Sequence, residues 1–278
     1  MDGDGDRDFQ LIMQWPLPQF PTQTLPPVAV EVVGSSTAGA KGSWVTIISE
    51  IPFETGWIAL GTYLQTSVGG GNTATSLDLG CDGTVVIADL LLGHRHRYCT
   101  MFPLRLPVGA TLQARVGGEL ANRRARIYVQ LFGGEPDAGL AAPMLITTYG
   151  ATTSGGLHLV PGTSVDKTDW SWHEVTASTV HPIHALMVLV QGWQQFADSA
   201  HFALDVGIGP AGSETVIIPD HRFSTVASDD YVSPASPQFY PLAMAIPAGT
   251  RLAVRGGRVE DTVSGTTNVE VGLYGFTY

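Results

Sequence analysis

The chain has 278 residues, enough for one large domain or two ordinary ones, and it carries 25 acidic against 14 basic side chains. A nucleic-acid-binding surface needs a cationic stripe, which the net charge of −11 and the small basic clusters at 94–97 and 123–126 do not supply. The sequence contains no apolar run long enough to span a membrane, and the acidic N-terminus does not resemble a secretory signal, so synthesis in a cytosol is expected.

The N-terminal segment, residues 1–27, is predicted to be an extended arm. Its last twelve residues contain five prolines, and closely spaced prolines disfavour both a helix and a central strand. Exposed aromatic side chains often mark a contact, so the arm is interpreted as an anchor laid into a groove of a partner. The alternative is an unbound tail. The predicted anchor residues are Trp15, Pro16, Pro18, Phe20 and Pro21.

The rest of the chain repeats itself. The clearest match is Leu77-Asp78-Leu79-Gly80, which returns as Leu204-Asp205-Val206-Gly207. Other matches are Ser43-Trp44 with Ser171-Trp172, Thr84–Asp89 with Thr215–Asp220, Leu106–Leu112 with Ile246–Leu252, Arg115 with Arg255, and Leu131–Gly133 with Leu273–Gly275. The offset rises from 127 (204 − 77) to 142 (273 − 131) in collinear order, as loop insertions into a shared fold produce. We therefore expect two modules, 28–137 and 138–278, with a short join near 134–142.

Both copies have the composition of strands. Short β-branched runs are separated by Gly- and Pro-rich turns, and several alternate apolar with polar residues. Predicted strands lie at 28–33, 45–48, 84–87, 111–116, 126–132, 185–190 and 269–276. The best helical candidate, 193–198, is short and lacks caps. The predicted fold class is all-β, with two tandem jelly-roll-like β-sandwich modules behind the arm.

Groups that could hold a metal or form a disulfide are few. His94 and His96 form an HxH pair, but a metal needs further ligands and the second copy has no matching histidines. We therefore predict no metal site and no cofactor. Cys81 and Cys99 are eighteen residues apart; they are expected to be buried thiols, with a bridge between neighbouring strands as the alternative in an oxidising environment.

No catalytic set repeats between the copies, and the Gly-x-Ser-x-Gly nucleophile motif is absent. Asp89 and Asp220 occupy equivalent positions, which we interpret as a duplicated turn at the end of a strand. The equivalent Arg115 and Arg255 are expected to bridge to a carboxylate or to backbone carbonyls. The equivalent Trp44 and Trp172 are expected in the core. From these patterns we predict that the chain is not an enzyme.

Two segments, Phe102–Arg115 and Tyr240–Arg255, resemble a segment of tailed-bacteriophage structural proteins. In that family the phrase Ile-Pro-Ala-Gly-Thr-Arg-Ile-Ala-x-Arg precedes a closing strand that ends in Leu-Tyr-Gly, and Val269–Phe276 supplies this ending. The resemblance implies a virion component with β-sandwich modules, such as a head fibre, a capsid decoration or a tail part. It implies no active-site residues.

The expected function is therefore that of a bacteriophage virion structural protein, attached to capsid, neck or tail through the arm. It would reside in the virion after assembly in the host cytoplasm, contact other virion proteins, and self-associate as a homo-oligomer. One alternative is a module that binds a host receptor or carbohydrate, for which the candidate aromatic platforms are Trp57, Trp170, Trp172 and Trp193. A lesser alternative is a glycan-cleaving enzyme that uses paired carboxylates, with candidates Glu54, Asp89, Asp220, Asp229 and Asp230.

Overall fold

The computed structural model describes residues 22–64, 75–92, 97–133, 145–192, 200–225, 232–233, 238–260 and 269–278. Regular structure in these ranges consists of eighteen strands, and no helix occurs among them. The predicted all-β fold class is confirmed. Since no described segment is helical, none provides an apolar helix of membrane-spanning length. The helical candidate at 193–198 lies outside the described residues.

The first eight strands form two antiparallel sheets that face each other. They are β1 (Thr22–Val33), β2 (Val45–Ile48), β3 (Thr55–Leu64), β4 (Thr75–Cys81), β5 (Thr84–Leu91), β6 (Arg97–Leu106), β7 (Leu112–Gly118) and β8 (Arg124–Gly133). The strand orders are β1-β8-β3-β6 and β2-β7-β4-β5, which is the jelly-roll arrangement. Alternate residues of β8 point into the core between the sheets, as the period-two pattern of the sequence predicts.

The remaining strands repeat this plan. They are β9 (Leu145–Tyr149), β10 (Leu157–Leu159), β11 (His173–Thr176), β12 (Ile183–Gly192), β13 (Ala200–Ile208), β14 (Thr215–Thr225), β15 (Val232–Ser233), β16 (Gln238–Ile246), β17 (Leu252–Arg258) and β18 (Val269–Thr277). One sheet has the order β10-β18-β12-β16, with β9 also paired to β18, and the other has the order β11-β17-β13-β14-β15. Strands β9 and β10 together take the place of β1.

Strand β1 begins at Thr22, so residues 22–27 of the segment predicted as an arm belong to the sheet. Physically this is permitted because β1 pairs only with β8 and lies at the sheet edge, where a proline removes no ladder hydrogen bond on the solvent side. The pairing register shifts between Leu25 and Val30, so residues 26–29 leave the ladder as a bulge. The segment predicted as an arm, 1–27, therefore overlaps β1 at residues 22–27, and its remaining residues lie outside the described part of the chain.

The turns that the sequence marks with Pro and Gly occupy equivalent places in the two modules. Gly109 and Gly249 have φ values of 80° and 84°, a region that glycine enters without a steric penalty. Each turn leads directly into the strand that carries the repeated arginine, β7 in the first module and β17 in the second.

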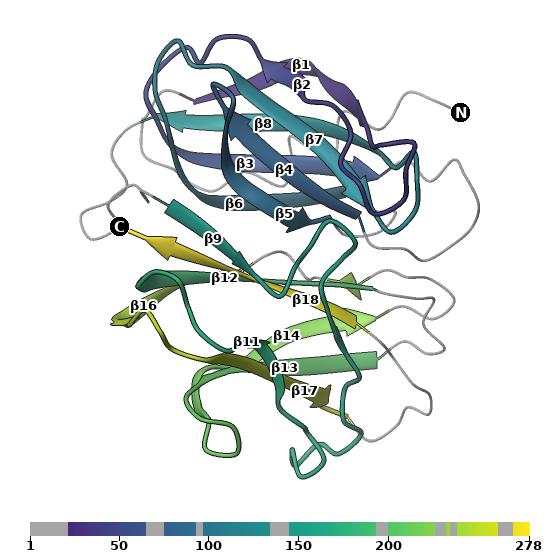
Figure 1. Cartoon of the computed structure of the whole chain (residues 1–278), viewed down its shortest axis with the longest axis vertical. Helices are drawn as coiled ribbons and strands as arrows, with labels where there is room; N and C mark the ends of the chain where they lie inside the picture. Colours follow the sequence, from purple (N-terminus) through teal and green to yellow (C-terminus); the bar gives the residue numbers. More distant parts are fainter. Residues whose placement is uncertain are drawn as a thin grey trace.

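The core of the first module extends onto one sheet of the second module, whose strands lie directly against the first module (Figure 1). Along β12, Leu186, Val188 and Val190 pack in the second module's own core, whereas Ala185, Met187 and Leu189 pack in the core of the first module. The sheet β10-β18-β12-β16 is thus buried on both faces. A strand in this position needs an uninterrupted apolar run, which explains why residues 185–190 show no alternation.

Candidate functional site

Asp78 of β4 is the centre of a buried charge cluster in the first module. Its Oδ2 accepts a hydrogen bond from Arg115 Nε at 2.8 Å, and its Oδ1 accepts one from the Asp89 N–H at 2.8 Å. Lys41 Nζ lies 2.9 Å from Asp78 Oδ1 and 2.9 Å from Asp89 Oδ1. The Arg115 guanidinium lies over the Trp44 ring, 4.5 Å from its centroid. Two cations and two carboxylates therefore neutralise one another here.

The second module contains the same cluster around Asp205 of β13. Arg255 Nε donates to Asp205 Oδ2 at 3.0 Å, the Asp220 N–H donates to Asp205 Oδ1 at 3.0 Å, and Lys167 Nζ lies 2.9 Å from Asp205 Oδ1. Lys167 is also 3.0 Å from Asp220 Oδ1, and Arg255 lies 4.7 Å from the centroid of the Trp172 ring. The duplication inferred from sequence thus extends to individual hydrogen bonds.

Both central carboxylates are held in the charged form. Burial alone would raise the pKa of Asp78 and of Asp205, because a carboxylate loses its hydration there. The hydrogen bond from the backbone N–H of Asp89 or Asp220 stabilises the charged form, and the nearby lysine and arginine do so as well. Together these interactions outweigh burial, so the pKa of each central carboxylate lies below its ordinary value. For Lys167, burial would lower the pKa, but the carboxylates of Asp205 and Asp220 raise it. Each central carboxylate is therefore ion-paired with a lysine and an arginine.

The structure corrects two details of the sequence interpretation. Asp89 and Asp220 lie within β5 and β14 rather than after a strand, at register shifts where φ is 50° and 53°. Such a bulge turns the aspartate N–H toward the carboxylate of the neighbouring strand. Trp44 and Trp172 are half-buried platforms for the arginines rather than core residues. The expected bridge from each repeated arginine to a carboxylate is confirmed.

Sequence reasoning missed the two lysines, although a signal was present. Lys41 and Lys167 are the only lysines in the 278 residues, and each lies a few residues before the repeated Ser-Trp pair. In a chain with so few lysines, two at nearly matching positions indicate a specific electrostatic role for both.

Tyr274 joins the modules. Its buried hydroxyl accepts a hydrogen bond from the Leu91 N–H at 2.8 Å and donates one to the Asp89 carbonyl at 2.9 Å. The Thr148 hydroxyl donates to the neighbouring Ala88 carbonyl. Side chains of β9 and β18 therefore occupy the outer edge of β5, where a further strand would otherwise pair.

A turn between β9 and β10 adds a second contact with the first cluster. Thr153 Oγ1 lies 3.2 Å from Asp89 Oδ1, and the Thr153 carbonyl accepts a hydrogen bond from Ser76 Oγ at 3.1 Å. Leu91 fits against Gly156 and Gly272, where an added Cβ would come within 2.8 and 3.0 Å of its Cδ1. The first charge cluster is thus part of the module interface.

Glu270 of β18 is a fully buried carboxyl near this turn. It accepts hydrogen bonds from Gln191 Nε2 and from the Gly156 N–H, and Oε1 lies 3.1 Å from His158 Nε2. Burial raises its pKa, which the amide, the backbone N–H and the imidazole counteract only in part. These contacts tie β10, β12 and β18 together beside the interface.

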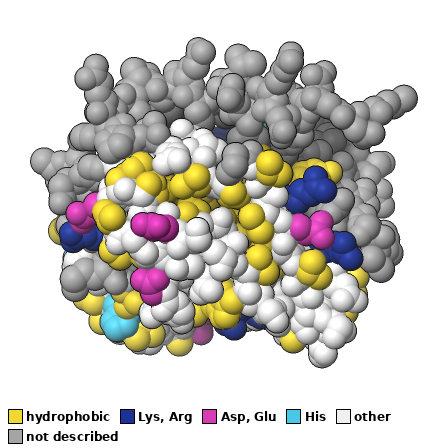
Figure 2. Space-filling model, turned by 90° about the horizontal axis from the view of Figure 1, so that it is seen from above, with side chains coloured by type: hydrophobic (Ala, Val, Ile, Leu, Met, Phe, Trp, Pro, Cys, Tyr) yellow, Lys and Arg dark blue, Asp and Glu magenta, His cyan; other side chains and the backbone are white. Residues whose placement is uncertain are grey.

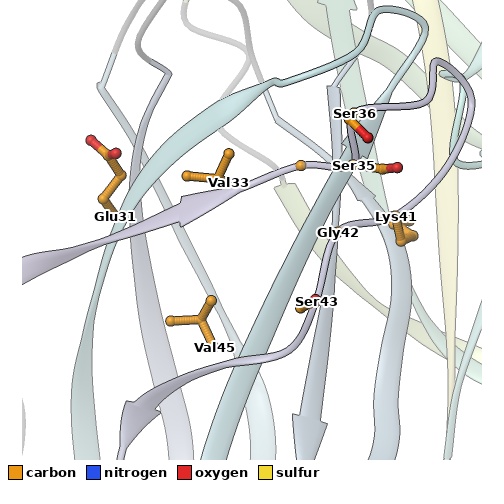
Figure 3. Close-up of a pocket in the computed structure, with 9 residues that line it drawn as sticks. Glu31, Val33, Ser35, Ser36, Lys41, Gly42, Ser43 and Val45 are labelled. Carbon is orange, nitrogen blue, oxygen red and sulfur yellow. The ribbon is translucent and has the colours of Figure 1, made fainter.

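An open groove of about 580 Å³ lies between β1 and β2 of the first module (Figure 3). Glu31 and Val33 line it from β1, Val45 lines it from β2, and Ser35 and Ser43 lie in the connection between them. Figure 2 shows this end of the molecule, where hydrophobic side chains form an irregular band with acidic and basic side chains at its borders. The lining provides hydroxyl groups, the Glu31 carboxylate and the Lys41 ammonium beside valine side chains.

The predicted anchor residues Trp15, Pro16, Pro18, Phe20 and Pro21 lie outside the described residues. The same holds for His94, His96, Asp229, Asp230 and Trp193. Within the described ranges no group of three His, Cys, Asp or Glu side chains could hold a metal ion.

The remaining candidates are dispersed. Glu54 forms an exposed pair with Arg105. Cys81 and Cys99 are partly buried free thiols on strands of different sheets, and burial raises the pKa of Cys99 to about 11. Of the proposed sugar platforms, Trp170 is 5% exposed, and Trp57 packs against Phe239 with its centroid 5.8 Å away. The described tryptophans therefore form no open stacking surface.

Comparisons with known proteins find structural similarity only at low TM-scores. No family model matches the chain, and no curated protein matches it. Similar solved structures include the STIV MCP (12% identity, 93% of this chain and 96% of that chain, TM-score 0.34) and the PBCV-1 virus capsid (10%, 94% and 94%, TM-score 0.36). With TM-scores below 0.5, these similarities assign neither a family nor a function.

A third similar structure is PNGase F, a glycosylasparaginase from Flavobacterium meningosepticum (10% identity, 92% of this chain and 96% of that chain, TM-score 0.39). The prediction that the chain is not an enzyme was based on the lack of a recognisable catalytic motif. This finding overturns that exclusion, because an enzyme is among the folds that align with nearly the whole chain. Catalytic carboxylates that converge only in space leave no motif in the sequence.

Proposed function

We propose that this chain is a structural protein of a virus particle, of the tailed-bacteriophage type that its repeated segments resemble. The two modules, β1–β8 and β9–β18, form the body, and the arm that we propose before Thr22 attaches that body to capsid, neck or tail. The chain would then reside in the virion, with other virion proteins and further copies of itself as partners.

The observation that carries the proposal is the fusion of the modules into one body. The sheet that contains β12 and β18 is buried on both faces, and Tyr274 and Thr148 bond to the edge of β5. A particle component must keep the relative orientation of its parts when it is loaded by neighbours. A shared core with hydrogen-bonded strand edges provides that stiffness, whereas a flexible linker would not.

The arm is the proposed attachment element. Strand β1, which follows it, is held by β8 along most of its length. An anchor placed before Thr22 would therefore transmit force directly into a sheet. Trp15 and Phe20 are the proposed hydrophobic contacts, with Pro16, Pro18 and Pro21 keeping the arm extended so that little conformational entropy is lost on docking.

Mass spectrometry of purified particles from a culture that expresses the chain tests the role. We expect the chain at a fixed ratio to the major particle proteins, and a reconstruction should show density for two adjacent β-sandwiches. A double variant, Trp15→Ala with Phe20→Ala, should fold as the wild type does but be depleted from particles. Leu120→Ala, in an exposed turn of the first module, is the control. Particles that never contain the chain would overturn the proposal, and undiminished incorporation of the double variant would overturn the role of the arm.

A further inference from the structure

The buried carboxyl of Glu270 lies on the face of its sheet that covers the first module. Side chains alternate in direction along β18, so Glu270 shares this face with Tyr274 and Phe276, which pack in the core of the first module. A Cβ added at Gly156 would lie 3.0 Å from the Glu270 Cβ and 2.8 Å from Leu91 Cδ1. Glu270 and a residue of the first module thus lie against the same glycine.

The partners of this carboxyl differ in their access to solvent. Its Oε2 accepts hydrogen bonds from Gln191 Nε2 of β12 and from the Gly156 N–H, and its Oε1 lies 3.1 Å from His158 Nε2 of β10. The Glu270 side chain is 0% exposed, whereas the His158 side chain is 50% exposed. An imidazole that reaches solvent therefore stands next to a carboxyl that does not.

The duplicated scaffold does not require this cluster. Tyr128 stands three residues before the repeated leucine of β8, as Glu270 does in β18. In the same ladders, Gly61 pairs with Tyr128 where Gln191 pairs with Glu270. A buried carboxyl stabilises a fold less than an apolar side chain of similar size. Its presence on the sheet face that another module covers, and not at the equivalent place in the first module, indicates a specific role at the interface.

Few charged groups face Glu270 within the described residues. On β10 the facing group is His158, β12 contributes a neutral amide, and the turn between β9 and β10 contains no ionisable side chain. From the first module, Asp89 Oδ1 pairs with Lys41 Nζ at 2.9 Å, and Tyr274 uses its hydroxyl proton on the Asp89 carbonyl. The ionisation of Glu270 is thus set by its burial and by one imidazole.

We propose that His158 and Glu270 form a proton-controlled switch, which holds the turn between β9 and β10 against the first module. One proton between Oε1 and Nε2 leaves the pair without net charge, whichever atom carries it, and Oε2 accepts the Gly156 N–H. When that proton leaves, an uncompensated carboxylate remains buried, and water can reach it only if the turn moves away. Thr153 would then withdraw from Asp89, and the first charge cluster would open to solvent.

The switch should close in acid and open as the pH rises. Burial raises the pKa of Glu270 above its ordinary value of 4.5, and its hydrogen bonds and His158 counteract burial only in part. The folded chain therefore keeps a proton that the unfolded chain releases. The stability that this proton provides is fully present below pH 4.5 and is lost as the pH rises through the folded pKa.

Hydrogen exchange of the full chain at about pH 5 and about pH 8 tests the proposal. After correction for intrinsic exchange rates, the protection of the Gly156 and Leu91 amides should fall by roughly tenfold, the change that one unit of pKa shift produces. Glu270→Gln cannot ionise but still accepts the Gly156 N–H, so its protection should not depend on pH. His173→Gln, on β11 of the other sheet, is the matched control and should behave as the wild type does.

A carbon-13 NMR titration of the Glu270 carboxyl in the wild type gives a second measure, and the carboxyl should titrate above pH 4.5. These two measurements on the wild type decide the question if Glu270→Gln does not fold. The proposal is overturned by equal protection at both pH values, by a Glu270→Gln chain that opens with pH as the wild type does, or by a carboxyl that titrates at or below pH 4.5. All of these results come from the purified chain, so they leave the particle role untouched.

Discussion

The two charge clusters have the same members and bonds but are enclosed differently. In the first module the side chains of Lys41 and Asp89 are 9% and 23% exposed, whereas those of Lys167 and Asp220 are 29% and 43% exposed. The equivalent Gly117 and Gly257 show what covers each cluster. An added Cβ would meet Thr153 of the other module at 2.7 Å in the first case.

In the second case the cover comes from the same module. A Cβ at Gly257 would overlap the Trp170 ring, which belongs to the loop that also supplies Lys167. The second module thus closes its own cluster with Trp170 of its β10–β11 loop, whereas the first module relies on its neighbour. If this difference in enclosure controls stability, equivalent substitutions should cost more in the first module than in the second.

The largest expected effect is loss of a central carboxylate. Asp78→Asn should lower the free energy of unfolding by about 3–5 kcal/mol, because Lys41 and Arg115 lose their counter-charge in a buried setting. Asp205→Asn should cost less, since Lys167 can turn toward water. Urea denaturation of both variants measures the difference. Glu54→Gln, which breaks the exposed pair with Arg105, is the control and should cost less than about 1 kcal/mol. Equal losses at both aspartates would show that enclosure does not matter.

The second-largest effect is expected from removing the Tyr274 hydroxyl at the module interface. Tyr274→Phe leaves the Leu91 N–H and the Asp89 carbonyl buried without partners, at about 1–3 kcal/mol for each unsatisfied group. The first module should also become more open to hydrogen exchange along β5. The control is Phe132→Tyr, which adds a hydroxyl at the equivalent place in the other module. Unchanged exchange protection of β5 in Tyr274→Phe would contradict the assigned role.

Acid should destabilise the second module through His221, which replaces Leu90 of the first. Burial lowers the pKa of His221 to about 4 from 6.5, although the Gln238 contact acts in the opposite direction. The unfolded chain therefore binds a proton more readily, and stability is lost as pH falls from 6.5 toward 4. Between pH 7 and pH 5 the loss should be on the order of 2 kcal/mol. His221→Leu should remove this part of the pH dependence, which denaturation curves of the variant and the wild type at several pH values measure. Identical pH profiles for the two proteins would refute the role of His221.

The sequence predicted the scaffold well because repeated turns and strands leave local signals. The match of Leu77–Gly80 with Leu204–Gly207 identifies β4 and β13. The apolar run at 185–190 identifies a strand, but it did not indicate that this strand is buried on both faces. The clusters were partly visible, since Arg115 and Arg255 were expected to bridge to a carboxylate.

The module interface could not be predicted, because it depends on groups that meet only after folding. Tyr274 bonds to residues more than 180 positions earlier in the chain, with separations of 183 to Leu91 and 185 to Asp89. The conformation of Asp89 was also missed. The strand-like run Val-Val-Ile-Ala that precedes Asp89 gives no sign of a bulge in the sequence. The left-handed φ of Asp89 is imposed by the carboxylate of Asp78 on the next strand.

The smallest expected effect compares two glycines beneath the tryptophan platforms. A Cβ at Gly207 would lie 2.6 Å from Trp172, whereas a Cβ at Gly80 would lie 3.1 Å from Trp44. Gly207→Ala must therefore displace its ring and disturb the contact with Arg255, at about 1–2 kcal/mol, while Gly80→Ala needs only a small shift. Thermal unfolding and tryptophan fluorescence of both variants measure the difference. The cluster of the second module is the more exposed of the two, yet it has the tighter contact between glycine and ring. A larger loss of stability in Gly207→Ala than in Gly80→Ala would therefore show that local packing, rather than enclosure, determines the cost at this position.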